Sequence, residues 1–171
     1  MINPTTSSNW LIEGKLLIGR YPTDCSDLKQ LIDIGVKIFV DLTEAKQENL
    51  TPYVVPNHCH YINFPMRDQK IRDDTETIDF IHSLYSLYKS LKDEEIMYIH
   101  CKGGLGRTGV IAGLLIAQIN NITDYSTIYK ILNESLKSRQ FKMNDKKKMK
   151  LYKSPQTLIQ IKQLKKLTFK V

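Results

Sequence analysis

Hydrophobic and polar residues along the chain fall into two kinds of segment, short apolar runs and longer amphipathic stretches. The short runs are bounded by Gly, Pro or charged residues, which predicts buried strands. We expect these strands at 16–18, 36–42, 61–64 and 96–101. The stretches repeat apolar residues three or four positions apart, which is the spacing of one helix face. We expect these helices around 28–32 and at 75–91, 110–119, 128–136 and 158–167.

The order of these elements indicates an α/β fold. A strand, a helix and a second strand in succession imply a right-handed crossover between parallel strands. We therefore expect a central, mainly parallel sheet flanked by helices on both faces, in a single domain over residues 1–171. The segment 43–60 carries two prolines and mixed charge, so we expect mostly loop there, with a short helix near Glu48. Trp10 and its apolar neighbours are expected to pin the N-terminus to the body.

The segment from Cys101 to Gly109 joins the last predicted strand to the most apolar helix. A turn at a helix start is an anion site, because unpaired backbone N–H groups and the positive end of the helix dipole both face it. Gly103, Gly104 and Gly106 let the backbone curve so that successive N–H groups converge. We therefore expect this turn to bind phosphate.

Two side chains give the turn its chemistry, Cys101 and Arg107, in the arrangement Cys-x5-Arg. A thiol beside a helix N-terminus and a guanidinium is expected to lose its proton well below the ordinary value of about 8.5. Arg107 can hold two phosphoryl oxygens and stabilise the charge that develops during transfer. Thr108 can donate a hydrogen bond to the sulfur. His100 is better placed to orient the loop through its ring nitrogens than to act as a base.

The run from His100 to Gly109 resembles the signature loop of the cysteine-dependent protein tyrosine and dual-specificity phosphatases, and within them the compact cyclin-dependent-kinase-associated type. His, Cys, the glycines, Arg and the following hydroxyl residue all agree with that signature. The resemblance implies a phosphocysteine intermediate and no metal or organic cofactor. It implies catalytic roles for Cys101, Arg107, Thr108 and His100. It also implies a phosphate-binding loop of Lys102, Gly103, Gly104, Leu105, Gly106 and Arg107.

Three other interpretations of the turn fit less well. Gly104 to Gly109 matches G-x-G-x-x-G, but a dinucleotide-binding site needs a second strand that presents an acidic residue to a ribose, and here helices follow. The ATP-binding loop needs Lys directly before Thr, where this chain has Arg107. A buried structural cysteine would leave Arg107 and the glycines unexplained.

The loop 64–69 supplies the candidate general acid, Asp68. Ligands of α/β sheets bind at the carboxyl ends of strands, so Asp68 and Cys101 can share one crevice. In the phosphatases that the chain resembles, an Asp on a mobile loop at this place protonates the leaving oxygen, and the preceding Phe-Pro supports the alignment. The polar residues directly after Asp68 depart from the small residues that relatives often have. Asp73 and Asp74 are rival acids, although Asp73 is better explained as a helix cap.

The segment from Gln156 to Gln160 resembles the Gln-Thr-x-x-Gln of the phosphatase family's glutamine loop. The resemblance implies that Gln156, with Gln160 as a second candidate, positions the hydrolytic water. Ordinary polarity at a helix start explains the pattern equally well.

Composition is that of a globular protein, with 42% hydrophobic and 25% charged residues. No apolar run is long enough to span a membrane, and the polar start does not resemble a signal peptide. Three cysteines are too few and too odd in number for a secreted disulfide framework, so we expect the reducing environment of the cytoplasm. We also expect a monomer. Either Cys25 or Cys59 could form a regulatory disulfide with Cys101, which the sequence leaves open. His58, Cys59 and His60 are too few ligands for a metal site.

The net charge of +7 favours anionic partners. No nucleic-acid-binding module is visible, so we do not expect nucleic acid as a partner. Six lysines crowd the segment from Lys142 to Lys153. This segment is either a solvated face or a docking patch for an acidic protein or an anionic lipid surface.

These observations predict a protein phosphatase for phosphotyrosine and for phosphoserine or phosphothreonine, because 171 residues leave little room for loops that deepen a tyrosine-specific pocket. One alternative is a phosphoinositide or other polyanion, selected by Lys102 and the basic surface. Leu105 argues against it, since phosphoinositide phosphatases of the tensin kind carry a second loop lysine there. A second alternative is a phospho-binding module without catalysis, which would not need Cys101, Arg107 and Asp68 together.

Overall fold

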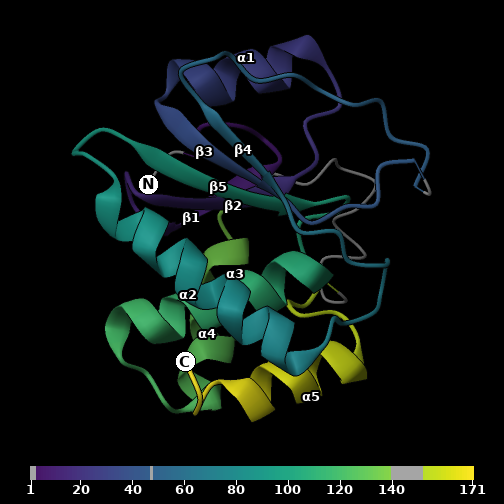
Figure 1. Ribbon diagram of the computed structural model, residues 1–171, viewed down its shortest axis with the longest axis vertical. Helices are drawn as coiled ribbons and strands as arrows, with labels where there is room; N and C mark the ends of the chain where they lie inside the picture. The colour runs from purple at the N-terminus through teal and green to yellow at the C-terminus, as the bar shows by residue number, and fades with distance from the viewer. Residues whose placement is uncertain (1–2, 47, 140–151) are drawn as a thin grey trace.

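A five-stranded sheet forms the centre of the computed structural model, which describes residues 3–46, 48–139 and 152–171. The strands lie in the order β1-β2-β5-β3-β4 (Figure 1). Four of them are parallel, and β1 pairs antiparallel with β2 at one edge. The strand bounds are β1 Ser8–Ile12, β2 Leu16–Arg20, β3 Val36–Asp41, β4 His60–Asn63 and β5 Ile96–Cys101. The mainly parallel sheet predicted from the sequence is confirmed.

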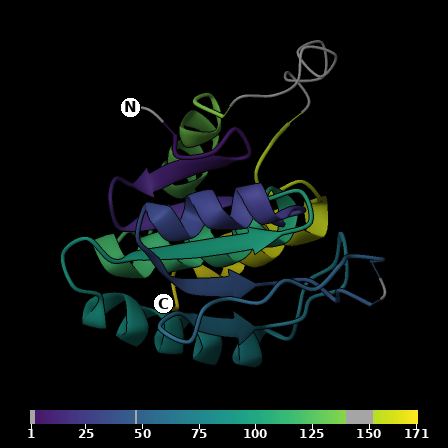
Figure 2. The same ribbon diagram turned by 90° about the horizontal axis from the view of Figure 1, so that it is seen from above.

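Helices cover both faces of this sheet, as predicted. Their bounds are α1 Cys25–Asp33, α2 Asp74–Ser90, α3 Gly106–Asn120, α4 Tyr125–Leu136 and α5 Leu158–Leu167. Figure 1 shows α1 on one side of the sheet and the other four on the opposite side. Seen from above, α1 runs along the direction of the strands (Figure 2).

Two apolar cores lie on the two faces of the sheet. Alternate residues of a strand point to opposite faces, and in a parallel sheet both sets are buried. Leu17, Phe39 and Tyr98 pack with Leu31 of α1 in the smaller core. Their neighbours one position along, such as Ile18, pack in the larger core with residues of α2, α3, α4 and α5.

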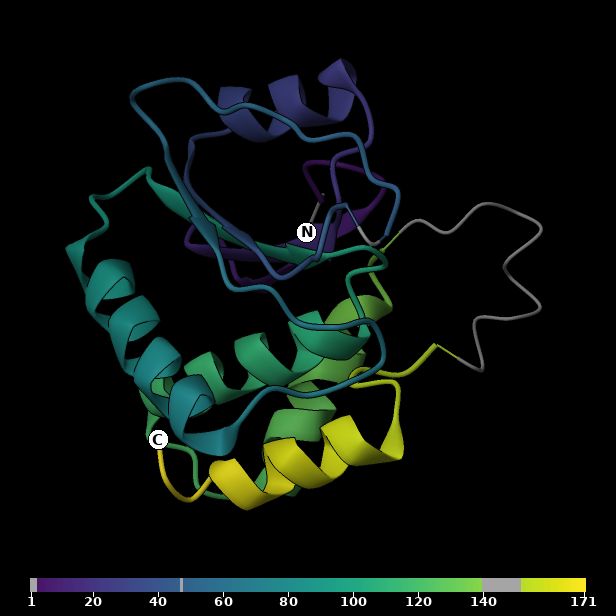
Figure 3. The same cartoon turned by 45° about the vertical axis from the view of Figure 1, so that its right-hand side comes forward.

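The helix α3 is the central element of the larger core. Every residue from Gly106 to Ala117 is buried, and α3 contacts α2, α4, α5 and β5. Figure 3 shows it enclosed between the sheet and the outer helices. The helix behind the predicted turn is therefore a rigid support.

Capping side chains and one left-handed residue fix several helix ends. Asp24 begins α1 and accepts a hydrogen bond of 2.8 Å from the Asp27 N–H. Asp73 begins α2 and Asp124 begins α4 in the same way. Asn121 adopts a left-handed φ of +53° at the end of α3. The predicted interpretation of Asp73 as a helix cap is confirmed.

Two features differ from the sequence predictions. Trp10 lies in the edge strand β1, which the sequence analysis did not predict, and it packs against the smaller core. The described residues around Glu48 form turns, so the helix predicted there is wrong. One helical bond forms, from the Glu48 N–H to the Glu44 oxygen, but Asn49 has a φ of +52° and breaks the helical path.

Three smaller points concern membranes, charge and cysteines. Within the described part of the chain, no helix is long and apolar enough to cross a membrane. Of the predicted basic segment, residues 142–150 lie outside the described residues, and Lys153 is exposed. Cys25 is exposed, whereas Cys59 and Cys101 are buried, and all three thiols are free. Cys59 donates to the Val36 oxygen at 3.4 Å.

Candidate active site

The predicted turn lies at the carboxyl edge of the sheet, between the end of β5 and the first turn of α3. The parallel registers pair Cys101 with Arg20 of β2, and His100 with Asp41 of β3. Cys101 is therefore at the middle of the sheet edge, where ligands of α/β proteins bind. Its side chain is buried at the base of the turn.

Close packing against backbone requires a glycine at one of the three predicted positions, and close packing against a side chain favours a glycine at a second. Gly104 has a φ of +68°, and a Cβ there would lie 2.2 Å from the Gly19 oxygen. A Cβ on Gly106 would lie 2.8 Å from Oε1 of Gln160. Nothing lies within 4 Å of the Cβ position of Gly103, so packing does not require a glycine there. Gly104 therefore lets the turn pack closely against β2, and Gly106 lets it pack closely against the start of α5.

The backbone N–H groups at the start of α3 are left for an anion. Leu105 is the N-cap residue of α3, and no side chain caps it. The Lys102 oxygen accepts from the Tyr21 N–H at 3.4 Å, and the Leu105 oxygen accepts from Oγ of Ser154 at 2.8 Å. Because C=O and N–H point in opposite directions across a trans peptide, these bonds turn the following N–H groups to the other side of the loop. This arrangement is compatible with the predicted anion site, whose binding of phosphate stays a prediction.

Arg107 is buried and already has two carboxylate partners. Its Nη1 and Nη2 donate to Oε1 and Oε2 of Glu48 at 2.5 and 2.9 Å, and Nη2 also donates to Oδ1 of Asp68 at 3.0 Å. A further bond of 2.8 Å joins Nη1 to the Met66 oxygen. Burial alone lowers the pKa of Arg107, but the bond to Glu48 and the nearby negative charges raise it above its ordinary value. The guanidinium is therefore permanently charged and fixed in orientation.

Glu48 is the residue of this site that the sequence analysis missed. Burial raises the pKa of its carboxyl, but the bonds from Arg107 and from the Glu44 N–H reverse this and hold the pKa below its ordinary value. Its position in the sequence could have suggested it, since Glu48 follows β3 and the loops after parallel strands gather at one sheet edge. Position alone does not distinguish Glu48 from Glu44, the other acidic residue of the same loop.

Asp68 lies beside Arg107, with its Oδ1 3.0 Å from Nη2 of the guanidinium. Its side chain is 55% exposed, so water and substrate can reach it. The residues after it are bound to the start of α5, because Thr157 Oγ1 donates to the Gln69 oxygen and Gln160 Nε2 donates to the Lys70 oxygen. The acid loop and the glutamine segment are therefore neighbours.

The two rival acids have structural partners elsewhere. Asp73 caps α2 by accepting from two backbone N–H groups. Asp74 pairs with Lys166 of α5 at 2.5 Å and accepts from Gln163 at 2.9 Å. Neither of these contacts involves the turn.

His100 is buried directly before the nucleophile candidate. Burial lowers the pKa of His100 to about 4, with Asp41 opposing and Arg107 adding to the effect. Its Nε2 lies 2.6 Å from the Tyr53 hydroxyl, and burial raises the pKa of Tyr53 far above its ordinary value. Tyr53 and His100 are thus both neutral and share one hydrogen bond, while Nδ1 of His100 lies 3.9 Å from Oδ1 of Asp41. His100 can orient the turn but is too weak a base to activate a thiol.

Thr108, Gln156 and Gln160 differ in their burial and in their hydrogen-bond partners. The Thr108 hydroxyl is buried and has no hydrogen-bond partner among the described residues, so the predicted bond to Cys101 is not formed in this state. Gln160 is buried and forms a capping box with Thr157. Gln156 is exposed, and its Oε1 lies 3.1 Å from the position that a Cβ on Gly106 would take. Gln156 is therefore the freer of the two to meet a ligand.

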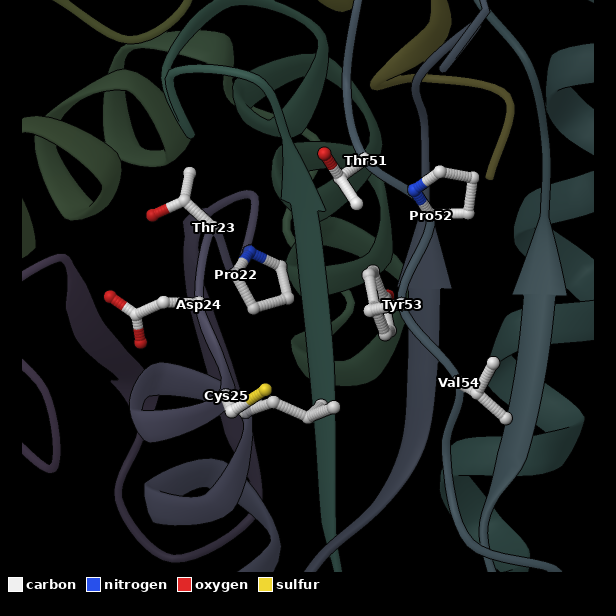
Figure 4. A pocket seen from close by; sticks show the side chains of 9 residues that line it. Pro22, Thr23, Asp24, Cys25, Thr51, Pro52, Tyr53 and Val54 are labelled. Atoms are coloured by element: carbon white, nitrogen blue, oxygen red, sulfur yellow. The ribbon is translucent and has the colours of Figure 1, made fainter.

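A largely apolar cavity of about 260 Å³ opens at the same sheet edge, on the side of α1 (Figure 4). One wall is the segment from Pro22 to Cys25, and the other is the segment from Thr51 to Val54. Both walls are tied to the turn, the first through the Tyr21–Lys102 backbone bond and the second through Tyr53 and His100. Cys25 lines this cavity rather than the turn.

Cys101 and a fixed Arg107 on one turn, with the Asp68 carboxylate beside the arginine, are the groups expected of a cysteine-dependent phosphatase. A family model described as "Swiss Army Knife protein, DSP-PTPase phosphatase domain" matches residues 5–161. The chain therefore belongs to the dual-specificity and protein tyrosine phosphatase family.

Relatives and solved structures agree with this assignment. "Putative tyrosine phosphatase 197R" of Invertebrate iridescent virus 6 is 40% identical over 126 residues, covering 73% of this chain and 46% of that protein. The crystal structure of Tk-PTP in the active form has a TM-score of 0.70 at 18% identity, covering 96% of this chain and 98% of that one. Kinase associated phosphatase, crystallised with its catalytic cysteine replaced by serine, has a TM-score of 0.65 at 17% identity, covering 92% and 90%. The two structures support the fold.

The chain spans about half the length of the curated relatives that it matches.

Proposed function

We propose that this chain hydrolyses phosphate monoesters on proteins, with phosphotyrosine as the first substrate and phosphoserine or phosphothreonine as further ones. The observation that carries the proposal is that Cys101 and Arg107 bracket one turn, while Asp68 lies 3.0 Å from the Arg107 guanidinium. A cysteine, an arginine and an acid in this relation are the groups needed to attack phosphorus, hold its oxygens and protonate the leaving group.

In the first step the Cys101 thiolate attacks phosphorus, so that an S–P bond forms while the P–O bond to the alcohol or phenol breaks. Asp68 gives its proton to the departing oxygen. The turn N–H groups and Arg107 hold the remaining phosphoryl oxygens. In the described residues Nε of Arg107 donates to nothing, so it is one donor ready for this task.

In the second step water attacks the phosphocysteine, the P–S bond breaks and phosphate leaves. Asp68, now ionised, takes a proton from the water. Gln156, exposed beside Gly106, orients that water. Thr108 donates to the departing sulfur, for which its buried and unpartnered hydroxyl is available in the described structure. His100 stays neutral throughout and fixes the turn through Tyr53.

Replacing the nucleophile tests the proposal. Cys101→Ser should lower hydrolysis of an aryl phosphate by at least about 10³-fold, while binding of tungstate, a tetrahedral dianion, is retained. Cys25→Ser is the matched control, because Cys25 is exposed and lines the separate cavity. Undiminished hydrolysis by Cys101→Ser would refute the assignment. Tungstate binding without hydrolysis by the unaltered chain would instead favour a phospho-binding module.

Location in the cytoplasm is also part of the proposal. It is supported by three free thiols, one of which must stay reduced to act as nucleophile. Fractionation of cells that express the chain tests it, and recovery from an oxidising compartment would contradict it.

A further inference from the structure

Arg139 is a buried cation behind the phosphate-binding turn, on the side away from the ligand. It follows α4, and only 3% of the residue is exposed. Its guanidinium donates to the Gly103 oxygen at 3.4 Å and twice to the Gly104 oxygen at 3.3 Å. Two further bonds of 3.0 and 2.6 Å go to Oδ1 of Asn9 in β1.

The charge of Arg139 is not balanced by any described carboxylate. All of its hydrogen-bond partners are neutral, and in 3–46, 48–139 and 152–171 no Asp or Glu oxygen lies within 4.0 Å of it. Buried charges are normally paired, because an unpaired one carries a large desolvation cost. Burial lowers the pKa of Arg139 to about 10, while the nearby Tyr98 and Cys101 raise it and Arg20 lowers it. Arg139 is still cationic at neutral pH.

The bonds from Arg139 also decide where two backbone donors point. The Gly103 and Gly104 carbonyls share their peptide planes with the N–H groups of Gly104 and Leu105. Those N–H groups therefore point away from Arg139, to the ligand side of the turn. Neither donates to a described residue. A cation on the carbonyl side of a peptide polarises its N–H further, which strengthens the bond to an anion.

We propose that Arg139 is a positioning residue of the phosphate-binding turn, and that its charge is balanced across the loop by the Cys101 thiolate or by a bound phosphoryl group. It acts through two aligned peptide groups and never touches the substrate. The inference rests on the proposed function in that the anion is taken to be the phosphoryl substrate. In the sequence, Arg139 is an arginine in a segment that is otherwise basic through lysine alone. This choice of residue favours a structural role, because a guanidinium can bind several carbonyls at once.

Asn9→Asp separates the charge of Arg139 from its structural role. The replacement keeps an acceptor oxygen at the same place but supplies the carboxylate partner that Arg139 lacks. If the charge acts across the turn, tungstate should bind about tenfold more weakly, and the pH midpoint for alkylation of Cys101 by iodoacetamide should rise. Thermal stability should not fall, because a buried cation gains a partner. Unchanged tungstate affinity and an unchanged alkylation midpoint would overturn the proposal.

Two replacements of Arg139 complete the test. Arg139→Lys keeps the charge and loses the fork, so the fall in tungstate affinity should be smaller than for Arg139→Met, which loses both. Lys137→Gln is the matched control, because it removes one charge from the same turn of chain, where Lys137 is exposed and pairs with Glu134. It should change tungstate affinity by less than about twofold. Equal losses of tungstate affinity in Arg139→Lys and Arg139→Met would overturn the role of the charge. If Arg139→Met does not fold, the Asn9→Asp variant decides alone.

Neither readout needs turnover, so the two proposals can fail separately. Tungstate affinity is measured by calorimetry, and alkylation of Cys101 is followed by peptide mass spectrometry, which distinguishes it from exposed Cys25. A chain without phosphatase activity whose tungstate affinity still falls in Asn9→Asp would refute the proposed function and keep this inference. An active chain with unaltered affinity in Asn9→Asp would do the reverse.

Discussion

Arg107 is a buried cation whose two terminal nitrogens bind carboxylates before any substrate arrives. Glu48 and Asp68 differ as partners, since the Glu48 side chain is 8% exposed and that of Asp68 is 55% exposed. The buried Glu48 is a fixed ion-pair partner that holds Arg107 in its orientation. In the proposed reaction, a phosphoryl oxygen replaces the exposed Asp68 at the guanidinium and frees it to act as the acid. One guanidinium thus has a fixed side and an exchangeable side.

The exchangeable side gives the first prediction. Asp68→Ala should lower the hydrolysis rate by about 10²-fold for a poor leaving group and much less for a good one, because only the former needs its oxygen protonated. A series of aryl phosphates of increasing phenol pKa measures this. Asp73→Ala is the control, since losing a helix cap costs stability, about 1 kcal/mol, without leaving-group dependence. A uniform loss in Asp68→Ala would assign the acid elsewhere.

The fixed side gives the second prediction. Glu48→Gln keeps the shape but leaves Arg107 with one carboxylate fewer, so the free energy of unfolding should fall by about 2 kcal/mol. Glu44→Gln, in the same loop, should have little effect. Urea denaturation measures both. An unchanged stability of Glu48→Gln would mean that the buried pair is replaceable by neutral hydrogen bonds.

The same pair should make stability depend on pH. The pKa of Glu48 is lower in the folded chain than its ordinary 4.5, so its stabilisation is fully present above the ordinary value and is lost as the pH falls through the folded value. The difference in stability between the unaltered chain and Glu48→Gln should therefore be constant at neutral pH and shrink below about pH 4.5. A stability difference that grows on acidification would contradict a lowered pKa of Glu48 in the folded chain.

At the scale of elements, the turn connects β5 to α3 and packs against β2 at Gly104. Gly104 needs both a left-handed φ and the space against Gly19, whereas Gly103 needs neither. Gly104→Ala should therefore weaken tungstate binding and lower the free energy of unfolding by at least about 1–2 kcal/mol. Gly103→Ala should leave both nearly unchanged. Calorimetry and thermal denaturation compare the two, and equal effects would contradict the close packing of the turn against β2.

The elements around the turn could be predicted because their apolar residues are continuous and bounded. The strand β5 and the helix α3 are buried on all sides, so their sequences are almost wholly apolar. The strand β1 could not be predicted in this way, since Trp10 and its two apolar neighbours show no alternation and the strand lies at an edge. Asp68 could be found because it closely follows β4. Glu48 and Arg139 could not, because their roles depend on how distant segments fold back onto the turn.

At the scale of the whole molecule, the substrate is the open choice between phosphoproteins and phosphoinositides. The net charge of +7 favours both kinds of anionic substrate. At the turn, however, Lys102 is the single lysine, and Leu105 is apolar and only 4% exposed. A largely apolar cavity opens at the same sheet edge. These features favour a peptide over a polyphosphorylated headgroup.

Phosphate release from a panel of substrates tests this preference. Peptides that differ only in carrying phosphotyrosine, phosphoserine or phosphothreonine should all be hydrolysed, with phosphotyrosine fastest. Phosphoinositides in vesicles should be hydrolysed more slowly at matched concentration. The reverse order would assign the chain to polyanionic lipids. Cys101→Ser is the blank for every substrate.

The outer side of the turn is held by residues that lie far apart in the chain. Arg139, which is itself bound to Oδ1 of Asn9, donates to the Gly104 oxygen, and Oγ of Ser154 donates to the Leu105 oxygen. During translation the nucleophile therefore leaves the ribosome well before the last of the groups that shape its loop. A nascent chain halted before Ser154 would carry Cys101 without the hydrogen bond that holds the Leu105 carbonyl.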